Sequence, residues 1–492
     1  MNTFTNAMKS QTAWSKTWNG ADCLKTTLNS CLDMFGRSGA LRQASVSDKQ
    51  NIFRKAFEEN SDIAMKLLFY TRDIRGGYGE RDTFTDMLVW LANKHPESVE
   101  KNLWAVLEYG RAKDLYALIG TKSEGAMWDF MKSQFELDLK NMAAKKSISL
   151  LAKWIASPDA SSKRTAALGV KTAKMLGYKY TNLSEYKKKL RALRAYLDIP
   201  EAKMASGAWS EIEYSKLASQ CLIKHKKAWV RHDSDRYQEY LDNVNSGKTK
   251  MNTGAMTPCD IIRSVRSDYS KDLDTMWSNL IDYCEGNALV MCDTSGSMTW
   301  SGQGQMQPID VAVALSMYFA ERNKGELKNM FMTFESRPHL VEIDGIDLKH
   351  KYNSIMRAPW GGSTNLEAAF RELLRICVKG HVSQEDMPEA LIIISDMQIN
   401  CVDGLTNDGK ITFYEHMSRE YEKAGYKLPQ VVFWNVNASN PTFHATASQN
   451  GASMVSGYSP AVFKSVMQNI GVSPLDLMME IVNSDRYSKI TA

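Results

Sequence analysis

The second half of the chain changes its hydrophobic period at residue 286. Short apolar runs alternate there with amphipathic helical patterns, a pattern that builds a doubly wound, mostly parallel sheet. Such sheets bind ligands at the carboxyl ends of their strands. Residues 286–492 are therefore predicted to form a Rossmann-like α/β domain with its site at that edge. The predicted strands are Ala288–Met291, Met330–Phe334, Ala390–Ile394 and Val431–Val436, and the helices lie near Ile309–Glu321, Leu366–Val378, Thr412–Ala424 and Ala461–Asn469.

Hydroxyl and carboxylate side chains follow two of these predicted strands. Asp293, Ser295 and Ser297 lie directly after the first, and Asp396 ends the third. Thr364 lies in a Gly-Gly-Ser-Thr-Asn stretch between them. These are the hard oxygen ligands that Mg²⁺ prefers, and a set of five leaves room for water or a partner group. The sequence predicts a site for Mg²⁺ or another divalent cation here. The alternative is a serine-rich turn with two aspartates that only cap helices.

The first half of the chain has helical periodicity throughout. Paired patterns of 10 to 20 residues with short polar joins predict an α-helical, HEAT-like solenoid over residues 46–285, although no strict repeat is visible. Residues 1–45 are either an arm or a first helix, with a helical pattern at Cys23–Met34 that Gly36 and Gly39 interrupt. The glycine-rich stretch Arg72–Arg81 lacks the strand–loop–helix context of a phosphate-binding P-loop, so we interpret it as a connector between helices.

Positive charge is concentrated within the helical half. The whole chain has a net charge of +5, yet residues 145–231 contain 19 basic and 6 acidic residues. Basic helix faces with interleaved aromatic side chains can neutralise phosphates and stack on unpaired bases. The alternative is a solvated, solubilising helix face. The candidate RNA-binding residues are Lys187, Lys188, Arg191, Arg194, Lys224, Lys226, Lys227, Trp229 and Arg231.

Composition excludes several other classes of protein. No apolar run reaches the roughly 18 residues of a membrane span, and the first 20 residues lack a signal-peptide core. The eight cysteines contain no C-x-x-C pair and no histidine at zinc-like spacing, which favours reduced thiols in a cytoplasmic protein. No catalytic arrangement can be selected from the eight scattered histidines. We therefore expect no enzymatic activity.

The three-part pattern of Asp293 to Ser297, Thr364 and Asp396 resembles the metal-ion-dependent adhesion site (MIDAS) of von Willebrand factor A domains. That resemblance makes the five residues the ligands of the cation. It also implies an open coordination position that an acidic residue of a protein partner can fill.

A helical solenoid followed by an A domain resembles the TROVE (Ro autoantigen) architecture, and the sequence resembles the domain-of-unknown-function 2828 family more closely. The Ro-like relatives form a ring of helical repeats that binds small and misfolded RNAs, which makes RNA an expected partner by analogy. The segments that carry the resemblance include Arg72–Arg81, Tyr109–Leu115, Leu151–Trp154, Tyr186–Arg194, Arg231–Tyr237 and Ser456–Pro460.

These patterns predict a non-enzymatic, RNA-binding scaffold, a ribonucleoprotein component with a Mg²⁺-dependent protein-interaction site. A protein-interaction module or a viral structural module without RNA binding is the alternative. A metal-dependent phosphoesterase is the least favoured alternative, because a two-metal site needs more clustered carboxylates than Asp293 and Asp396.

Overall fold

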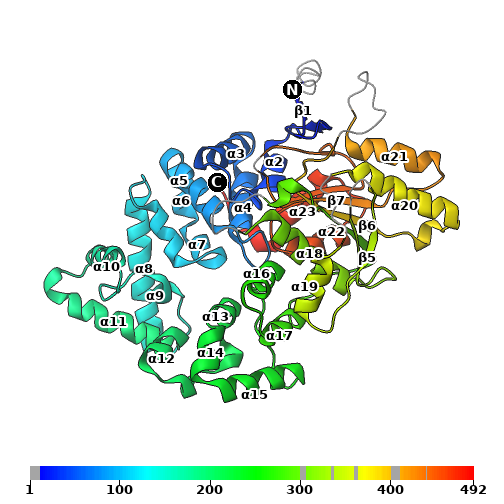
Figure 1. Ribbon diagram of the computed structural model, residues 1–492. Coiled ribbons are helices and arrows are strands. Elements are labelled where there is room, and N and C mark those ends of the chain that lie inside the picture. Colours follow the sequence, from blue (N-terminus) through cyan, green and yellow to red (C-terminus); the bar gives the residue numbers. More distant parts are fainter. Residues whose placement is uncertain (1–11, 300–305, 334–336, 359–363, 401–410, 439) are drawn as a thin grey trace.

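The computed structural model describes residues 12–299, 306–333, 337–358, 364–400, 411–438 and 440–492. It combines an α-helical solenoid with a doubly wound α/β domain (Figure 1). No helix of the described ranges is long and apolar enough to cross a membrane. The described cysteines are buried and form no disulfide.

Fifteen α-helices of the described chain make up the solenoid. All but α12 bury side chains against their neighbours; in the basic helix α11, for example, Tyr186, Leu190 and Leu193 face inward. The helices are α3 (Val46–Glu59), α4 (Ser61–Arg72), α5 (Arg81–Lys94), α6 (Pro96–Lys101), α7 (Leu103–Tyr109), α8 (Glu124–Ala143), α9 (Leu151–Trp154), α10 (Lys163–Met175), α11 (Leu183–Tyr196), α12 (Pro200–Ser206), α13 (Ser219–Lys224), α14 (Lys226–His232), α15 (Ser234–Asn245), α16 (Pro258–Asp268) and α17 (Asp272–Ser278).

The solenoid curves so that both of its ends meet the α/β domain (Figure 1). At the far end, Arg266 of α16 forms an ion pair with Asp310 at 2.7 Å. The Cys259 thiol donates to the Tyr458 carbonyl at 3.6 Å. The arc is thus closed through the α/β domain.

Six strands form the sheet of the α/β domain, in the order β5-β4-β3-β6-β7-β8. All neighbours are parallel except the edge strand β5, which is antiparallel to β4. The predicted strands and helices are found, and β5, β8, α19 and α23 are additional; Phe334, the last residue of one predicted strand, lies outside the described residues. The elements are β3 (Ala288–Cys292), α18 (Pro308–Arg322), β4 (Met330–Thr333), β5 (Leu340–Glu342), α19 (Leu348–Met356), α20 (Leu366–Gly380), β6 (Ala390–Ser395), α21 (Phe413–Lys423), β7 (Gln430–Asn435), β8 (Ala452–Ser456), α22 (Ala461–Gln468) and α23 (Pro474–Val482).

Helices cover both faces of this sheet, as adjacent residues of β7 illustrate. Trp434 packs against Phe319 of α18, and its neighbour Phe433 packs against Phe413 of α21. Since successive side chains of a strand point to opposite faces, α18 and α21 lie on opposite sides. Burial on both faces explains why these strands read as continuous apolar runs.

The segment before the solenoid differs from its prediction. Where the helical pattern predicts one helix at Cys23–Met34, the chain forms a hairpin of β1 (Trp14–Lys16) and β2 (Asp22–Leu24), then α2 (Ser30–Ser38). Gly36 does not interrupt the helix but lies inside it. A Cβ atom at Gly39 would lie 2.6 Å from the Ser456 carbonyl oxygen, so the absence of a side chain lets α2 approach β8.

The two ends of the described chain each pack on the other unit. Leu24 and Phe443 exchange two backbone hydrogen bonds of 2.9 Å, which attach the first residues to the α/β domain. Arg486 and the Tyr487 hydroxyl both bind the buried Asp73 carboxylate of the solenoid. The two units are therefore joined at both ends as well as in the middle.

Candidate metal centre and basic surface

The loops after β3 and β6 lie side by side at the carboxyl edge of the sheet. The two strands are parallel neighbours with Cys292 opposite Ile394, and the Asp293 N–H donates to the Ile394 carbonyl at 3.0 Å. This register brings Asp293 and Asp396 to the edge where the strand–helix alternation predicts a site.

Hydrogen bonds fix the orientation of the first carboxylate. The Ser295 N–H donates to Asp293 Oδ1 at 2.9 Å, and the Ser395 hydroxyl donates to Asp293 Oδ2. The hydroxyl oxygens of Ser295 and Ser297 lie 3.1 Å apart. Ser395 is a residue that sequence reasoning missed; its only signal is a hydroxyl at the end of a buried strand, next to Asp396.

The site is electrostatically suited to a cation. Asp293 is 1% exposed and Asp396 is 4% exposed. Burial and the neighbouring Asp396 raise the pKa of Asp293 to about 7, and burial also raises the pKa of Asp396. Within the described ranges, no lysine or arginine forms a salt bridge with either carboxylate. Two buried acids and two hydroxyls fit a hard divalent ion, which would supply the missing positive charge.

Thr364 lies close to the same loop through its backbone. Its carbonyl accepts a hydrogen bond of 3.0 Å from the N–H of Asn400, four residues after Asp396, and the residue is 1% exposed. A role of the Thr364 hydroxyl at the metal stays a prediction.

A cavity of about 650 Å³ opens over this edge. Its walls include Ser297 and Asp396 together with Trp18 and Gln398. The N-terminal hairpin forms part of the rim, since the Trp18 N–H donates to Gln398 Oε1 at 2.9 Å and Asn19 Nδ2 donates to the Gln398 carbonyl at 2.6 Å. The exposed indole of Trp18 therefore stands at the mouth of the candidate metal site, which the sequence alone did not indicate.

Three of the predicted RNA-binding residues are structural. Trp229 is fully buried and its Nε1–H donates to the Leu222 carbonyl at 3.2 Å, so the prediction of base stacking on this ring is wrong. Arg194 donates to the carbonyls of Ala152 and Ile155, both at 2.9 Å. Lys226 is 8% exposed and donates to Ser270 Oγ at 2.7 Å. The prediction is also wrong for these two cations, because their charged groups hold neighbouring segments.

The other six predicted cations lie at the surface. Lys188, Lys224 and Arg231 are exposed and form no ion pair within the described residues. Lys187 and Arg191 share Asp159, and Lys227 pairs with Asp268 at 3.1 Å. The basic region thus supplies a cationic surface, although acidic neighbours reduce the charge at three positions.

Sequence reasoning missed an exposed aromatic residue on the same surface. Tyr180, between α10 and α11, is 84% exposed, and Tyr196 at the end of α11 is 41% exposed. Exposed lysines at 174 and 179 lie nearby in the sequence. An aromatic residue in a short polar join has no periodic neighbours, so its exposure has no signal in the sequence.

Comparison with known proteins places both units in families without an assigned function. The family described as domain of unknown function DUF2828 matches residues 17–136 and 128–283, and the one described as DUF7788 matches residues 287–489. "Uncharacterized protein L728" of Acanthamoeba polyphaga mimivirus is 27% identical over 511 residues, which cover 95% of this chain and 87% of the viral protein.

A solved structure is similar over most of both chains. The crystal structure of the Deinococcus radiodurans Ro (Rsr) protein aligns with a TM-score of 0.47 at 13% sequence identity, over 88% of this chain and 93% of the Ro chain. The two DUF2828 matches together span more than half of the 492 residues. The chain therefore belongs to the DUF2828 family.

Proposed function

We propose that this protein is a non-enzymatic scaffold that holds RNA on its solenoid and a protein partner on its A domain. The observation that supports the metal half is the pair of buried carboxylates, Asp293 and Asp396, with which no lysine or arginine of the described residues forms an ion pair. Isolated buried charges are costly, so such a pair is maintained where an ion binds.

Five side chains would hold Mg²⁺ at this edge: Asp293, Ser295, Ser297, Thr364 and Asp396. The bound ion would act as a Lewis acid that accepts one further oxygen ligand. The cavity above it is open to a carboxylate of a partner protein. The Ser395 hydroxyl orients Asp293 by donating a hydrogen bond to its carboxylate. The side-chain amide oxygen of Gln398 holds the hairpin by accepting a hydrogen bond from the Trp18 N–H.

Exposed cations support the RNA half of the proposal. Seven lysines and arginines between residues 163 and 231 are exposed and form no ion pair within the described part of the chain. Tyr180 adds an exposed ring on which a base can stack. These seven residues are Lys163, Arg164, Lys174, Lys179, Lys188, Lys224 and Arg231.

Calorimetric titration with MgCl₂ and MnCl₂ tests the metal half. We expect one divalent ion per chain, lost in Asp293→Asn and retained in Asp344→Asn, a control at an exposed aspartate of the same domain. Mg²⁺-dependent capture of a protein partner should be lost in Asp293→Ala while RNA affinity is unchanged. Equal loss of both in a folded variant would contradict the two-site arrangement.

Binding of a mixed RNA pool at two salt concentrations tests the RNA half. If roughly six phosphates are contacted, affinity should fall by on the order of a thousandfold between 50 and 200 mM salt. Lys179→Glu with Lys188→Glu should weaken binding, whereas Lys423→Glu on the α/β domain should not. A flat salt response would leave the protein-interaction module without RNA as the function.

A further inference from the structure

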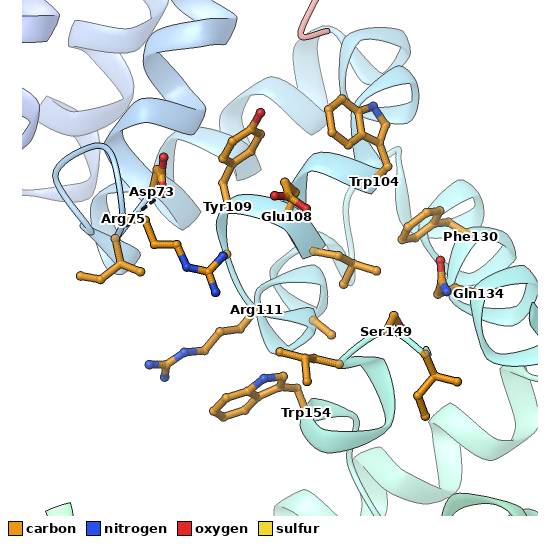
Figure 2. A pocket seen from close by; sticks show the side chains of 16 residues that line it. Asp73, Arg75, Trp104, Glu108, Tyr109, Arg111, Phe130, Gln134, Ser149 and Trp154 are labelled. Atoms are coloured by element: carbon orange, nitrogen blue, oxygen red, sulfur yellow. Dashed lines mark hydrogen bonds between the residues drawn. The ribbon is translucent and has the colours of Figure 1, made fainter. Parts of the chain in front are cut away.

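Three sequence segments that the proposed function leaves unused meet at one cavity. Arg72–Arg81, Tyr109–Leu115 and Leu151–Trp154 all contribute residues to a hollow of about 420 Å³ between α7, α8 and α9 (Figure 2). The first segment connects α4 to α5, as its sequence predicts. Its glycine-rich loop is therefore one wall of a cavity rather than an isolated connector.

Buried acids of this wall are already neutralised. Asp114 accepts hydrogen bonds from Arg72 at 2.8 Å and from Arg81 at 2.9 Å. Asp73 binds Arg486 and Tyr487, and also accepts from the Arg75 N–H at 3.0 Å. These contacts hold the wall in place, and both carboxylates already have cationic or hydroxyl partners.

Two arginines of the same segments have guanidinium groups that no described acidic residue pairs with. Arg75 and Arg111 are exposed, and within the described residues neither forms an ion pair. Both lie on one side of the cavity, as Figure 2 shows. The Arg111 N–H is held by Asp114 at 3.1 Å, and its guanidinium Cζ lies 4.8 Å from the centroid of the Trp154 ring.

Aromatic rings form much of the remaining surface. Trp154 lies beside Arg111, while Trp104 and Phe130 come from the opposite side (Figure 2). Among the described lining residues, Glu108 is the acidic side chain without an ion-pair partner, and it lies toward Trp104 and away from Arg111. Two arginines with Trp154 beside them on one side, and two further rings on the other, match a ligand with a phosphate and a flat base.

We propose that this cavity binds one unpaired nucleotide of RNA. Arg75 and Arg111 contact its phosphate, and the base stacks on Trp154 with its exocyclic amine toward Glu108. A volume of about 420 Å³ suits a ligand of this size. A base in a duplex cannot enter, because it is stacked and paired. The inference rests on the proposed RNA binding and deepens it.

The basic helix α11 contacts the segment that forms one wall of the cavity. Arg194 of α11 donates to the carbonyls of Ala152 and Ile155 and so clamps α9, the short helix that carries Trp154. Lys153 lies 5.6 Å from the same ring. Helix α11 and the cavity are therefore linked through α9, which contains no acidic residue.

Fluorescence anisotropy with two labelled probes tests this site in the full chain. The probes are a 12-nucleotide single-stranded RNA and the same sequence as a blunt duplex. Arg111→Gln and Trp154→Leu should each weaken single-strand binding by on the order of tenfold and leave duplex binding unchanged. Trp154→Phe should retain most of the affinity. Arg357→Gln, at an exposed arginine of the α/β domain, is the matched control.

The outcomes separate this inference from the proposed function. Wild-type affinity in both cavity variants, with loss in Lys179→Glu/Lys188→Glu, would overturn the cavity and leave RNA binding standing. No RNA binding by the wild-type protein would overturn both. Photocrosslinking of wild-type protein to a 4-thiouridine RNA gives a readout that needs no variant. The adduct should map to Trp104, Arg111 or Trp154, and adducts confined to α10 and α11 would contradict the assignment.

Discussion

At the scale of single residues, Asp293 and Asp396 place two like charges in a buried space. Each is almost fully buried, and burial together with Asp396 raises the pKa of Asp293 to about 7. A folded state that must contain both charges is weakened until a cation binds. If a cation binds here as proposed, its binding should raise the stability of the folded protein and be visible in unfolding measurements.

Asp293→Asn removes one of these charges while keeping the shape of the side chain. We expect the variant to be more stable than the metal-free wild type at pH 8, by on the order of 2 kcal/mol. Millimolar MgCl₂ should raise the unfolding midpoint of the wild type but not of the variant. Thermal unfolding with EDTA or MgCl₂ measures both effects, and equal stabilisation of both proteins by Mg²⁺ would contradict the assignment.

Asp114, unlike Asp293, is a buried carboxylate that cationic side chains neutralise. Its carboxylate is fully buried and binds both Arg72 and Arg81, so its removal leaves Arg72 buried without a partner. Asp114→Asn should lower the free energy of unfolding by about 3 kcal/mol. Glu58→Gln, which breaks the exposed pair with Arg54, should cost less than about 1 kcal/mol. Urea unfolding of the two variants tests the contrast, and similar losses would refute it.

At the scale of elements, the loop before β8 supports the loop that carries Asp396. His444 is 1% exposed, and its Nε2 lies 3.0 Å from the carbonyl oxygen of Met397, a residue with a left-handed φ of 63°. Burial lowers the pKa of His444 to about 4. The imidazole is thus neutral at physiological pH, and it stabilises a loop conformation that is unfavourable for a residue with a side chain.

This depressed pKa predicts a loss of stability in acid. In the unfolded chain His444 takes up its proton near pH 6.5, whereas the folded protein resists it down to about 4. Stability is therefore complete above pH 6.5 and falls as the pH decreases towards 4, by about 3 kcal/mol in total. His444→Gln should flatten this part of the profile, and His339→Gln, at an exposed histidine, should not. Urea unfolding at pH 7 and pH 5 compares them; an unchanged slope in His444→Gln would contradict the prediction.

The elements also show which parts of the fold could be predicted from the sequence. Strands buried on both faces, such as β6, carry continuous apolar runs that can be recognised directly. The strand β8 contains serines at 453 and 456, and its burial depends on α2 and α23. The register between β3 and β6 brings the two predicted metal-binding aspartates, Asp293 and Asp396, to the same edge, and parallel pairing at a strand end made that predictable. Burial of Trp229 was not predictable, because Trp209 and Tyr214 cover it from other segments.

At the scale of the whole molecule, the residues that follow α23 pack against the core of the solenoid. Tyr487 is 1% exposed and packs beside Tyr70 and Tyr109 of the solenoid, with ring centroids 5.9 and 5.5 Å away. Asn102 of the solenoid donates to the Thr491 carbonyl at 2.7 Å. A change in the last ten residues should therefore be felt in α4 and α7.

Tyr487→Ala tests this coupling. We expect a loss of about 3 kcal/mol, because a large buried ring is removed and Asp73 loses a donor. Amide hydrogen exchange should accelerate in α4 and α7, although both lie far earlier in the sequence. Faster exchange confined to residues after 470 would indicate that the two units are stable independently. Tyr180→Ala, at an exposed tyrosine, is the control.

The packing of the residues after α23 on the solenoid also bears on the order of events during synthesis. The solenoid leaves the ribosome first, but the partners of Asp73 lie more than 400 residues later. At a translation rate of about 5–20 residues per second, residues 286–492 take roughly 10–40 s to appear. During that interval Tyr70 and Tyr109 lack the ring that covers them in the finished protein. Those two rings therefore stay without this cover on the nascent solenoid until Tyr487 has been synthesised.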